Sequence, residues 1–265
     1  MLIIAERINS SRKSIAQAVE AKDVAFIQNE AKNQAAAGAH YIDINAGVFV
    51  GKETDYLKWL ADTVQEVVDI PLCLDSPDPE AIKAVFPLCQ KTPMINSITL
   101  EPERMAALLP LAVEKKAKLV ALCQAEDAMA DTTDEKFALA EKLVEKILEA
   151  KLPIDDLYID PLVYPLSTNH ESALHTINAT ERIMKAFPGV HTIYGLTNVS
   201  YGLPNRKLIN RTFMCAAITK GLDAAIIDPT DKNIYAALQA TVAVNGHSAF
   251  CMDYITAFRQ GRLEV

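Results

Sequence analysis

Hydrophobic positions recur along the chain in short runs, and each run is followed by a longer stretch in which apolar residues return with helical spacing. The runs are almost continuously apolar and often β-branched, which is typical of strands buried on both faces. We therefore predict eight strands: Leu2–Ala5, Tyr41–Ile44, Pro71–Leu74, Met94–Ile95, Leu119–Cys123, Leu157–Ile159, Thr192–Leu196 and Ala224–Ile227.

The longer stretches predict amphipathic helices. Between residues 54 and 68, for example, Leu57, Leu60, Ala61 and Val64 fall on one helical stripe. The predicted helices are Asp23–Ala37, Thr54–Val68, Pro102–Glu114, Thr133–Ala150, Ser172–Phe187 and Arg211–Lys220.

This alternation of eight strands with helices predicts the fold. Eight strand–helix units in about 250 residues are the arithmetic of an α/β protein with a (β/α)8 TIM barrel. An open, doubly wound sheet is the alternative, but it usually carries a Gly-rich turn after its first strand, and residues 6–10 contain no glycine. We see no linker, so we expect residues 1–265 to form a single TIM-barrel domain.

Composition limits the partners. The 265 residues include 34 Asp and Glu against 26 Lys and Arg, a net charge of −8, which argues against nucleic acid as a partner. The apolar runs are far shorter than the roughly 18 residues of a spanning helix. The first residues also lack the pattern of a signal peptide. We expect a cytoplasmic protein that binds neither nucleic acid nor membrane.

Metal-ligand patterns are weak. The five cysteines include no C-x-x-C pair, and most lie in apolar strings, so we expect buried thiols in a reducing compartment. His170 and His175 are five residues apart, which on a helix separates them by about 140°. We therefore expect no directly bound metal.

Polar residues follow every predicted strand. In a TIM barrel the active site lies at the carboxyl ends of the strands. Asp and Asn also favour such positions for local reasons, so each one alone is ambiguous. Together they predict a polar barrel mouth without lysine, suited to a flat heterocycle with hydrogen-bond donors on its edge. The exits are Glu6–Arg7, Asp43–Asn45, Asp75–Ser76, Asn96–Ser97, Gln124, Asp160–Pro161, Thr197–Asn198 and Asp228.

Several of these exits carry motifs of a known family. The segments 1–9, 72–76, 94–97, 157–162, 195–200 and 205–213 occur in this order. Together they resemble the methyltetrahydrofolate:corrinoid protein methyltransferases, which are relatives of the folate-binding module of cobalamin-dependent methionine synthase. The resemblance extends from residue 1 to about residue 258.

The resemblance implies a homodimeric TIM barrel that binds tetrahydrofolate or 5-methyltetrahydrofolate as substrate. The methyl group would move to or from the cobalt of a cobalamin (corrinoid) carried by a partner protein. Carried over by position, Asp160 would pair with the N3–H and 2-amino edge of the pterin, Asp75 and Asn96 would contact its N1/N8 side, Asn198 would reach N5, Arg206 would lie near the folate, and Asp43 and Asn45 would line the mouth. The loop with Tyr201 and Gly202 would face the corrinoid.

The chemistry centres on the bond between N5 and its methyl group. Because a tertiary amine is a poor leaving group, a hydrogen-bond donor such as the Asn198 amide would stabilise the developing lone pair in the transition state. Two alternatives stay open. A dihydropteroate synthase would need a late-strand lysine and an Arg-x-His segment, and residues 223–228 contain neither. The other is a non-catalytic pterin-binding barrel. The direction of transfer and the identity of the corrinoid protein stay open as well.

Overall fold

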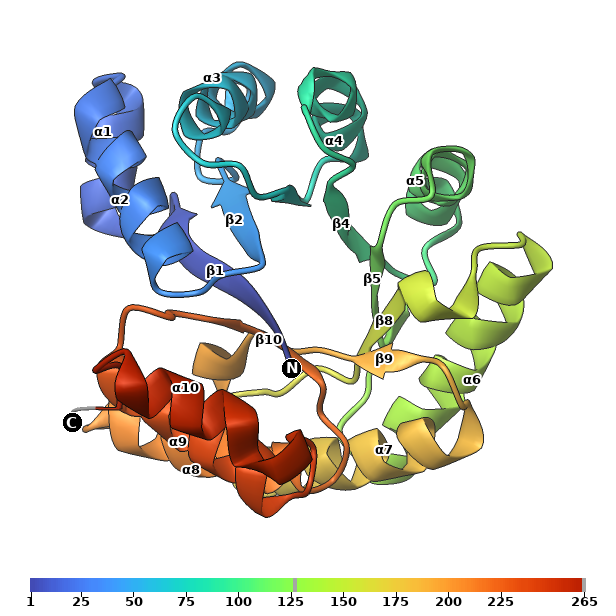
Figure 1. Cartoon of the computed structure of the whole chain (residues 1–265). Helices are drawn as coiled ribbons and strands as arrows, with labels where there is room; N and C mark the ends of the chain where they lie inside the picture. The colour runs from blue at the N-terminus through green and yellow to red at the C-terminus, as the bar shows by residue number, and fades with distance from the viewer. Residues whose placement is uncertain (126–127, 264–265) are drawn as a thin grey trace.

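The computed structural model describes residues 1–125 and 128–263, which form a nearly closed barrel of parallel strands inside a ring of helices (Figure 1). Neighbouring strands follow the order β10-β1-β2-β3-β4-β5-β8-β9. A parallel bridge between Gly195 and Ile226 joins the two ends of the sheet. The predicted (β/α)8 barrel is confirmed. Its strands are β1 (Leu2–Asn9), β2 (Tyr41–Asn45), β3 (Leu72–Asp75), β4 (Met94–Ile98), β5 (Leu119–Leu122), β8 (Leu157–Asp160), β9 (His191–Thr192) and β10 (Ala224–Ile227).

The helices around the barrel use the apolar stripes of the sequence. Their bounds are α1 (Lys13–Glu20), α2 (Val24–Ala36), α3 (Glu53–Gln65), α4 (Pro79–Val85), α5 (Pro102–Lys115), α6 (Thr133–Glu149), α7 (Ser172–Ala186), α8 (Arg206–Ile218), α9 (Lys232–Val244) and α10 (Met252–Arg259). Short 3-10 helices occur at η1 (Phe86–Leu88), η2 (Ile154–Asp156), η3 (Leu196–Ser200) and η4 (Ala249–Cys251), and β6 (Gln124–Ala125) pairs with β7 (Ala128–Met129) in a small hairpin.

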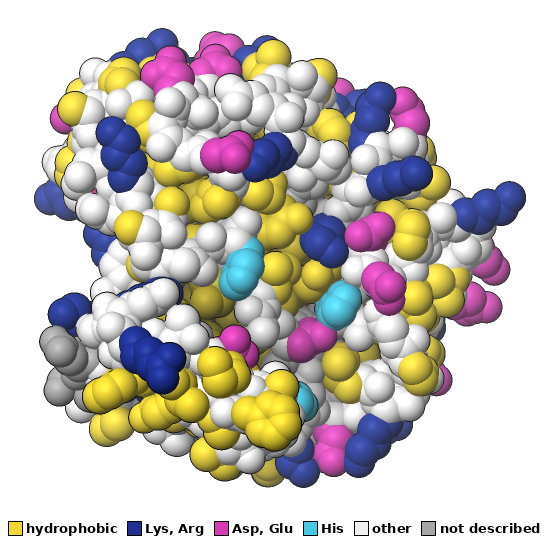
Figure 2. All heavy atoms as spheres, viewed as in Figure 1, with side chains coloured by type: hydrophobic (Ala, Val, Ile, Leu, Met, Phe, Trp, Pro, Cys, Tyr) yellow, Lys and Arg dark blue, Asp and Glu magenta, His cyan; other side chains and the backbone are white. Residues whose placement is uncertain are grey.

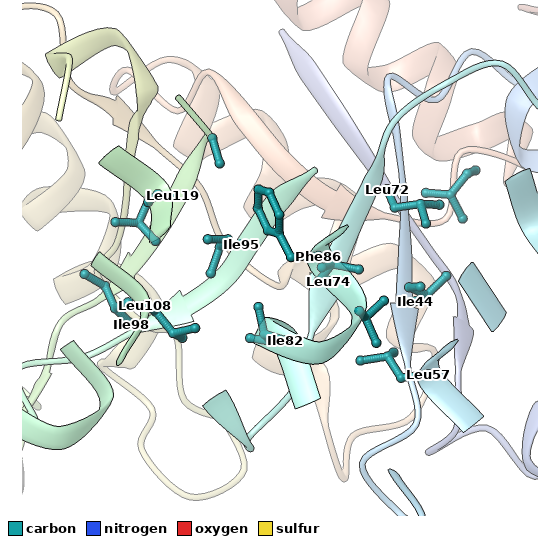
Figure 3. Close-up of a cluster of buried hydrophobic side chains, with 14 of the residues drawn as sticks. Ile44, Leu57, Leu72, Leu74, Ile82, Phe86, Ile95, Ile98, Leu108 and Leu119 are labelled. Carbon is teal, nitrogen blue, oxygen red and sulfur yellow. The ribbon is translucent and has the colours of Figure 1, made fainter. Parts of the chain in front are cut away.

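The outward faces of the strands pack against these helices. Figure 3 shows Leu57 of α3 and Ile82 of α4 directed toward Leu74 of β3, within one buried cluster. All three side chains are fully buried. The near-continuous hydrophobicity of the strands therefore has a simple cause, because each strand also buries its inner face.

The inner faces form an apolar plug below the mouth. The plug contains the buried side chains Ile4, Cys73, Met94, Val120, Tyr158, Ile193 and Ala224. In a strand, residues two positions apart point to the same side. The residue two places after each plug residue therefore faces the same interior one layer higher, which places Glu6, Asp75, Asn96 and Asp160 above the plug.

The structure differs from the sequence prediction mainly in the last third of the chain. The predicted strand Thr192–Leu196 is shorter, because the ladder with β8 ends at Thr192 and the backbone turns into η3. The predicted helix Arg211–Lys220 begins at Arg206. Its first turn begins with two exposed basic residues, Arg206 and Lys207, and its apolar Leu208 is also exposed, so no buried stripe marks the start of the helix.

Helices α1, α4, α9 and α10 were not predicted, since α1, α4 and α10 are short and α9 is apolar on most faces. Within the described residues, no helix is both long enough and apolar enough to cross a membrane.

Candidate active site

A cavity of about 320 Å³ opens at the carboxyl ends of the strands, and we call it the mouth. Most of its polar lining comes from the strand exits that the sequence singled out. The lining residues are Glu6, Asn9, Ser11, Arg12, Asp43, Asp75, Asn96, Leu122, Asp160, Leu162, Gly195, Thr197, Asn198 and Ile226.

The structure brings five of the seven predicted folate-binding residues together in this lining: Asp43, Asp75, Asn96, Asp160 and Asn198. Asn45 lies just behind them, and its Nδ2 donates to Asp75 Oδ2 at 3.0 Å. Asn45 Oδ1 accepts a hydrogen bond from Ser10 Oγ at 3.0 Å. Asn45 therefore orients the Asp75 carboxylate from outside the cavity.

Arg206 is not part of the lining. Its Nη2 donates to the Thr197 carbonyl at 2.8 Å and its Nε to Ser200 Oγ at 3.1 Å. The guanidinium thus holds both ends of η3, the segment that carries Asn198. Contact between Arg206 and folate remains a prediction.

Tyr201 and Gly202 follow η3 at the rim. The Tyr201 side chain is 68% exposed, and the guanidinium of Arg206 lies 5.6 Å from the centre of its ring. Ser167 Oγ donates to the Tyr201 carbonyl at 2.7 Å and ties this loop to the one after β8. Gly202 has φ +79°, and a Cβ there would lie 3.1 Å from Ser167 Oγ, so glycine suits this close crossing of two loops.

Asp43, which is buried, and Asp75, which is partly buried, form an acidic pair. Asp43 is 1% exposed, and its Oδ1 has no hydrogen-bond partner among the described residues. Burial, and next the charge of Asp75, raises the pKa of Asp43 well above its ordinary value. Burial raises the pKa of Asp75 to about 6, although the hydrogen bond from Asn45 lowers it. Two such carboxyls above an apolar plug favour a ligand that brings donors.

Asp160 ends β8 and is 5% exposed. Its Oδ1 accepts a hydrogen bond from the backbone nitrogen of Leu162 at 2.8 Å. Burial raises its pKa to about 7, despite the lowering effects of that bond and of the Lys136 charge. The Gly195 backbone also donates to this carboxyl, which lines the mouth and retains lone pairs suited to accept paired N–H donors.

Lys136 supports Asp160 from behind, and the sequence analysis did not find it. It lies on α6, its side chain is fully buried, and its Nζ donates to the carbonyls of Pro161 and Leu162 at 2.9 and 2.7 Å. The ammonium thereby fixes the backbone just after Asp160. The signal was a charged residue on the buried face of α6, which also contains Ala140 and Leu143.

Asn198 lies on the opposite side of the mouth from β3 and β4. A Cβ on Gly195 would lie 3.2 Å from Asn198 Nδ2, so the glycine leaves room for the amide. Within the described part of the chain, no hydrogen bond occupies the Asn198 side chain. The amide is therefore available to a ligand.

Glu6 and Arg12 complete this side, although the sequence analysis placed only Glu6 at a strand exit and gave neither a role. Arg12 Nη2 donates to Glu6 Oε1 at 2.9 Å, and Thr197 Oγ1 donates to Glu6 Oε2 at 3.3 Å. The signal for Glu6 was its position two residues after Ile4, on the same inner face of β1.

The described residues contain no group of three or more His, Cys, Asp and Glu side chains arranged to hold a metal ion. His175 Nδ1 instead accepts from the backbone nitrogen of Thr133 at 3.3 Å. The cysteines are free: Cys73 and Cys123 are buried, Cys89 and Cys215 are partly buried, and Cys251 is exposed.

Comparisons with known proteins show which family the chain belongs to. Residues 5–228 match the model of a family described as pterin binding enzyme. The chain belongs to the pterin-binding enzyme family. Over 265 residues this pterin-binding enzyme is 42% identical to a methylcorrinoid:tetrahydrofolate methyltransferase of Eubacterium limosum, with 99% of this chain and 98% of that protein covered. It therefore belongs to the same family as that methyltransferase.

More distant relatives include a longer enzyme and two solved structures with the same fold. Methionine synthase of Mycobacterium tuberculosis is 31% identical over 242 residues, which are 86% of this pterin-binding enzyme and only 20% of that longer protein. A solved dihydropteroate synthase from Clostridium difficile superposes with a TM-score of 0.73 at 15% identity, over 92% of this chain and 96% of the other. A dihydropteroate synthase from Coxiella burnetii gives 0.70 at 14% identity, over 93% and 94%. These two structures support the fold alone.

Proposed function

We propose that this pterin-binding enzyme transfers a methyl group between the cobalt of a corrinoid, carried by a partner protein, and N5 of tetrahydrofolate. One observation carries the proposal. Asp75, Asn96 and Asp160 line the mouth together with the unoccupied amide of Asn198, which lies across from β3 and β4 and follows β9, the neighbour of β8. This arrangement occurs in a chain 42% identical to a methylcorrinoid:tetrahydrofolate methyltransferase over its whole length.

Asp160 is the residue we assign to the N3–H and 2-amino edge of the pterin. A carboxylate accepts two parallel N–H donors well, and charge strengthens such bonds. Burial makes the ionised carboxylate of Asp160 energetically unfavourable, and its raised pKa reflects this cost. The N–H donors of a bound pterin would stabilise the ionised form in place of water. Asp75 and Asn96 are assigned to the N1/N8 side, with Asn45 and Asp43 behind and beside them.

Asn198 is the residue we assign to N5. When the methyl group leaves N5, the nitrogen retains the electron pair of the broken bond. A hydrogen bond from the Asn198 amide to N5 is therefore stronger in the transition state than in the ground state. In the opposite direction, the hydrogen bond from Asn198 weakens as N5 attacks the methyl group, because both directions share one transition state. Asn198 is held for this by Arg206 through η3.

The corrinoid must reach this site from outside. A cavity of about 320 Å³ is at the small end of ligand sites and accommodates a bicyclic pterin, whereas a corrin macrocycle is too large to enter. The cobalt would therefore approach across the rim, where Tyr201 and Gly202 lie next to the Asn198 segment. We assign these two residues to the corrinoid-facing surface.

We also propose that the enzyme is a homodimer in the cytoplasm. Large apolar side chains are exposed on η4 and α10, among them Phe250 at 93% and Phe258 at 69%. Figure 2 shows hydrophobic side chains gathered over the region of α9 and α10. Exposed apolar groups of this kind are typical of protein interfaces, and free thiols fit a reducing compartment.

Spectroscopy can test the activity directly. Methylcobalamin and tetrahydrofolate are mixed with the enzyme under anaerobic conditions, and loss of the methylcobalamin spectrum is followed alongside formation of 5-methyltetrahydrofolate. We expect enzyme-dependent conversion. Tight tetrahydrofolate binding without conversion of methylcobalamin, or of methylated corrinoid protein, would instead identify a non-catalytic pterin-binding barrel.

A further inference from the structure

The acidic residues of the mouth are unevenly distributed around the barrel. We call Asp75, Asn96 and Asp160, on β3, β4 and β8, the recognition half, and Glu6, Thr197 and Asn198 the reactive half. Strand β10 separates the members of the reactive half, since it pairs with β1 on one side and bridges to Gly195 on the other. Of the carboxylates in the described lining, Glu6 is the one that is hydrogen-bonded to Thr197, the residue directly before Asn198.

Glu6 is held firmly in place. Its side chain is 12% exposed, and its two oxygens accept separate hydrogen bonds, from Arg12 at 2.9 Å and from Thr197 at 3.3 Å. Thr197 directly precedes Asn198, so Glu6 contacts the segment that carries the amide assigned to N5. Each carboxylate oxygen retains a lone pair that can take a proton.

The charges around Glu6 come from several elements. Burial raises its pKa, and so does the charge of Asp228 after β10, whereas Arg12 and the Thr197 hydrogen bond lower it. Asp43 on β2 lines the same cavity, and the charge of Glu6 raises the pKa of Asp43. The net effect is a raised pKa for Glu6, which brings the pKa closer to neutral pH, where a carboxyl group exchanges protons efficiently.

The proposed reaction requires such a group. When N5–H of tetrahydrofolate attacks the methyl group, an N5–C bond forms, the cobalt–carbon bond breaks, and its electron pair stays on cobalt, which goes from cobalt(III) to cobalt(I). N5 then carries both the methyl group and its original hydrogen, with a positive charge. One proton must leave, and the Asn198 amide cannot accept it.

We propose that the Glu6 carboxylate accepts the proton released from N5 during methyl transfer to tetrahydrofolate and returns it in the reverse direction. This assignment rests on the proposed function and adds a catalytic base to it. Arg12 and Thr197 hold the carboxylate in the reactive half, while Asp75 and Asp160 are the carboxyls that we assign to the pterin edge.

The test uses Glu6→Gln, which retains the shape and an oxygen acceptor but removes the basic site. Transfer from methylcobalamin to tetrahydrofolate is measured from pH 5 to 8.5, together with tetrahydrofolate binding by calorimetry. We expect kcat to fall about a hundredfold, within the range for a general base, and binding to change less than threefold. The wild-type kcat should rise with pH through the Glu6 ionisation, and this rise should be absent in Glu6→Gln.

Two further variants separate chemistry from structure. Glu30→Gln removes a carboxylate that pairs with Arg7 on the outer side of β1, at 2.6 Å, and should leave kcat within twofold. Glu6→Asp keeps a carboxylate, so it should retain the pH rise with an intermediate kcat, even if Glu6→Gln does not fold.

The outcomes are distinct. A Glu6→Gln enzyme with kcat within threefold of wild type, or with an unchanged pH rise, would overturn the assignment, as would equal losses in binding and kcat. A wild-type enzyme that binds tetrahydrofolate but transfers no methyl group would contradict the proposed function itself.

Discussion

The two halves of the mouth are built differently. In the recognition half, Asp75 and Asn96 are register partners on adjacent strands, and Asp160 ends a strand that is fully buried. In the reactive half, β9 has two residues and Asn198 lies on a 3-10 helix, held by side chains from β1 and α8. We infer that the acceptors on the strands provide affinity for the pterin, whereas the amide that we assign to N5 depends on a turn that strand geometry does not provide.

Asn198→Ala should give the largest difference between the effects on turnover and on affinity. Loss of the amide removes a donor that acts mainly in the transition state, so we expect turnover to fall by roughly a hundredfold or more while tetrahydrofolate affinity stays within about tenfold. Single-turnover transfer and equilibrium binding measure the two quantities. Asn198→Asp, which keeps the size but exchanges the donor for a carboxylate, should be similarly slow. Equal losses in binding and turnover would remove Asn198 from its assigned role.

Asp160→Ala tests the opposite half. Pterin donors left without a partner in a buried site cost about 1–3 kcal/mol, so tetrahydrofolate affinity should fall roughly 5- to 150-fold. Calorimetric titration measures this change. Asp160→Asn, which keeps the volume, should also weaken binding because one of its two terminal atoms becomes a donor. Unchanged affinity would exclude Asp160 from the pocket.

The raised pKa of Asp160 predicts an inverse dependence of stability on pH. Folding raises this pKa from its ordinary 3.8 to about 7, so the folded protein binds the proton more tightly than the unfolded chain does between these values. The ligand-free enzyme should therefore lose unfolding free energy as pH rises from 5 to 7, by roughly 2 kcal/mol from this group.

Denaturant unfolding at several pH values measures this slope, and Asp160→Asn serves as the reference because it has no such titration. A parallel pH dependence of the two proteins would contradict the prediction. Tetrahydrofolate affinity should show the opposite trend and strengthen as pH rises to 7, because the ionised carboxylate is the form that accepts the pterin donors.

The sequence predicted the recognition half better than the reactive half, for a physical reason. Period-two strands place Asp75, Asn96 and Asp160 at predictable exits, and the family motifs give their order. The arrangement of η3 depends on contacts distant in sequence, such as Glu6 to Thr197, which are 191 positions apart. Lys136 was missed for a similar reason, because only the folded chain shows that its ammonium meets the carbonyls after Asp160.

Arg206→Ala tests whether the reactive half depends on its supports. Without bonds to the Thr197 carbonyl and Ser200 Oγ, η3 should be less well ordered, and we expect turnover to fall about tenfold with affinity within threefold. Steady-state kinetics and binding separate these effects, and Arg206→Lys should recover part of the loss. A larger loss in binding than in turnover would favour the direct folate contact that the family resemblance implies.

Tyr201→Ala should have the smallest effect and one confined to the rim. The exposed ring lies outside the mouth, so pterin binding and transfer from free methylcobalamin should stay within twofold. Transfer from a methylated corrinoid protein should slow by about three- to tenfold in kcat/KM, because the protein must dock across this loop. Leu148→Ala removes an exposed apolar side chain near the end of α6, away from the mouth and from the proposed dimer surface, so it provides the control and should leave both rates unchanged. Equal slowing with free and protein-bound corrinoid would place Tyr201 in the shared chemistry of the mouth and not at the docking surface.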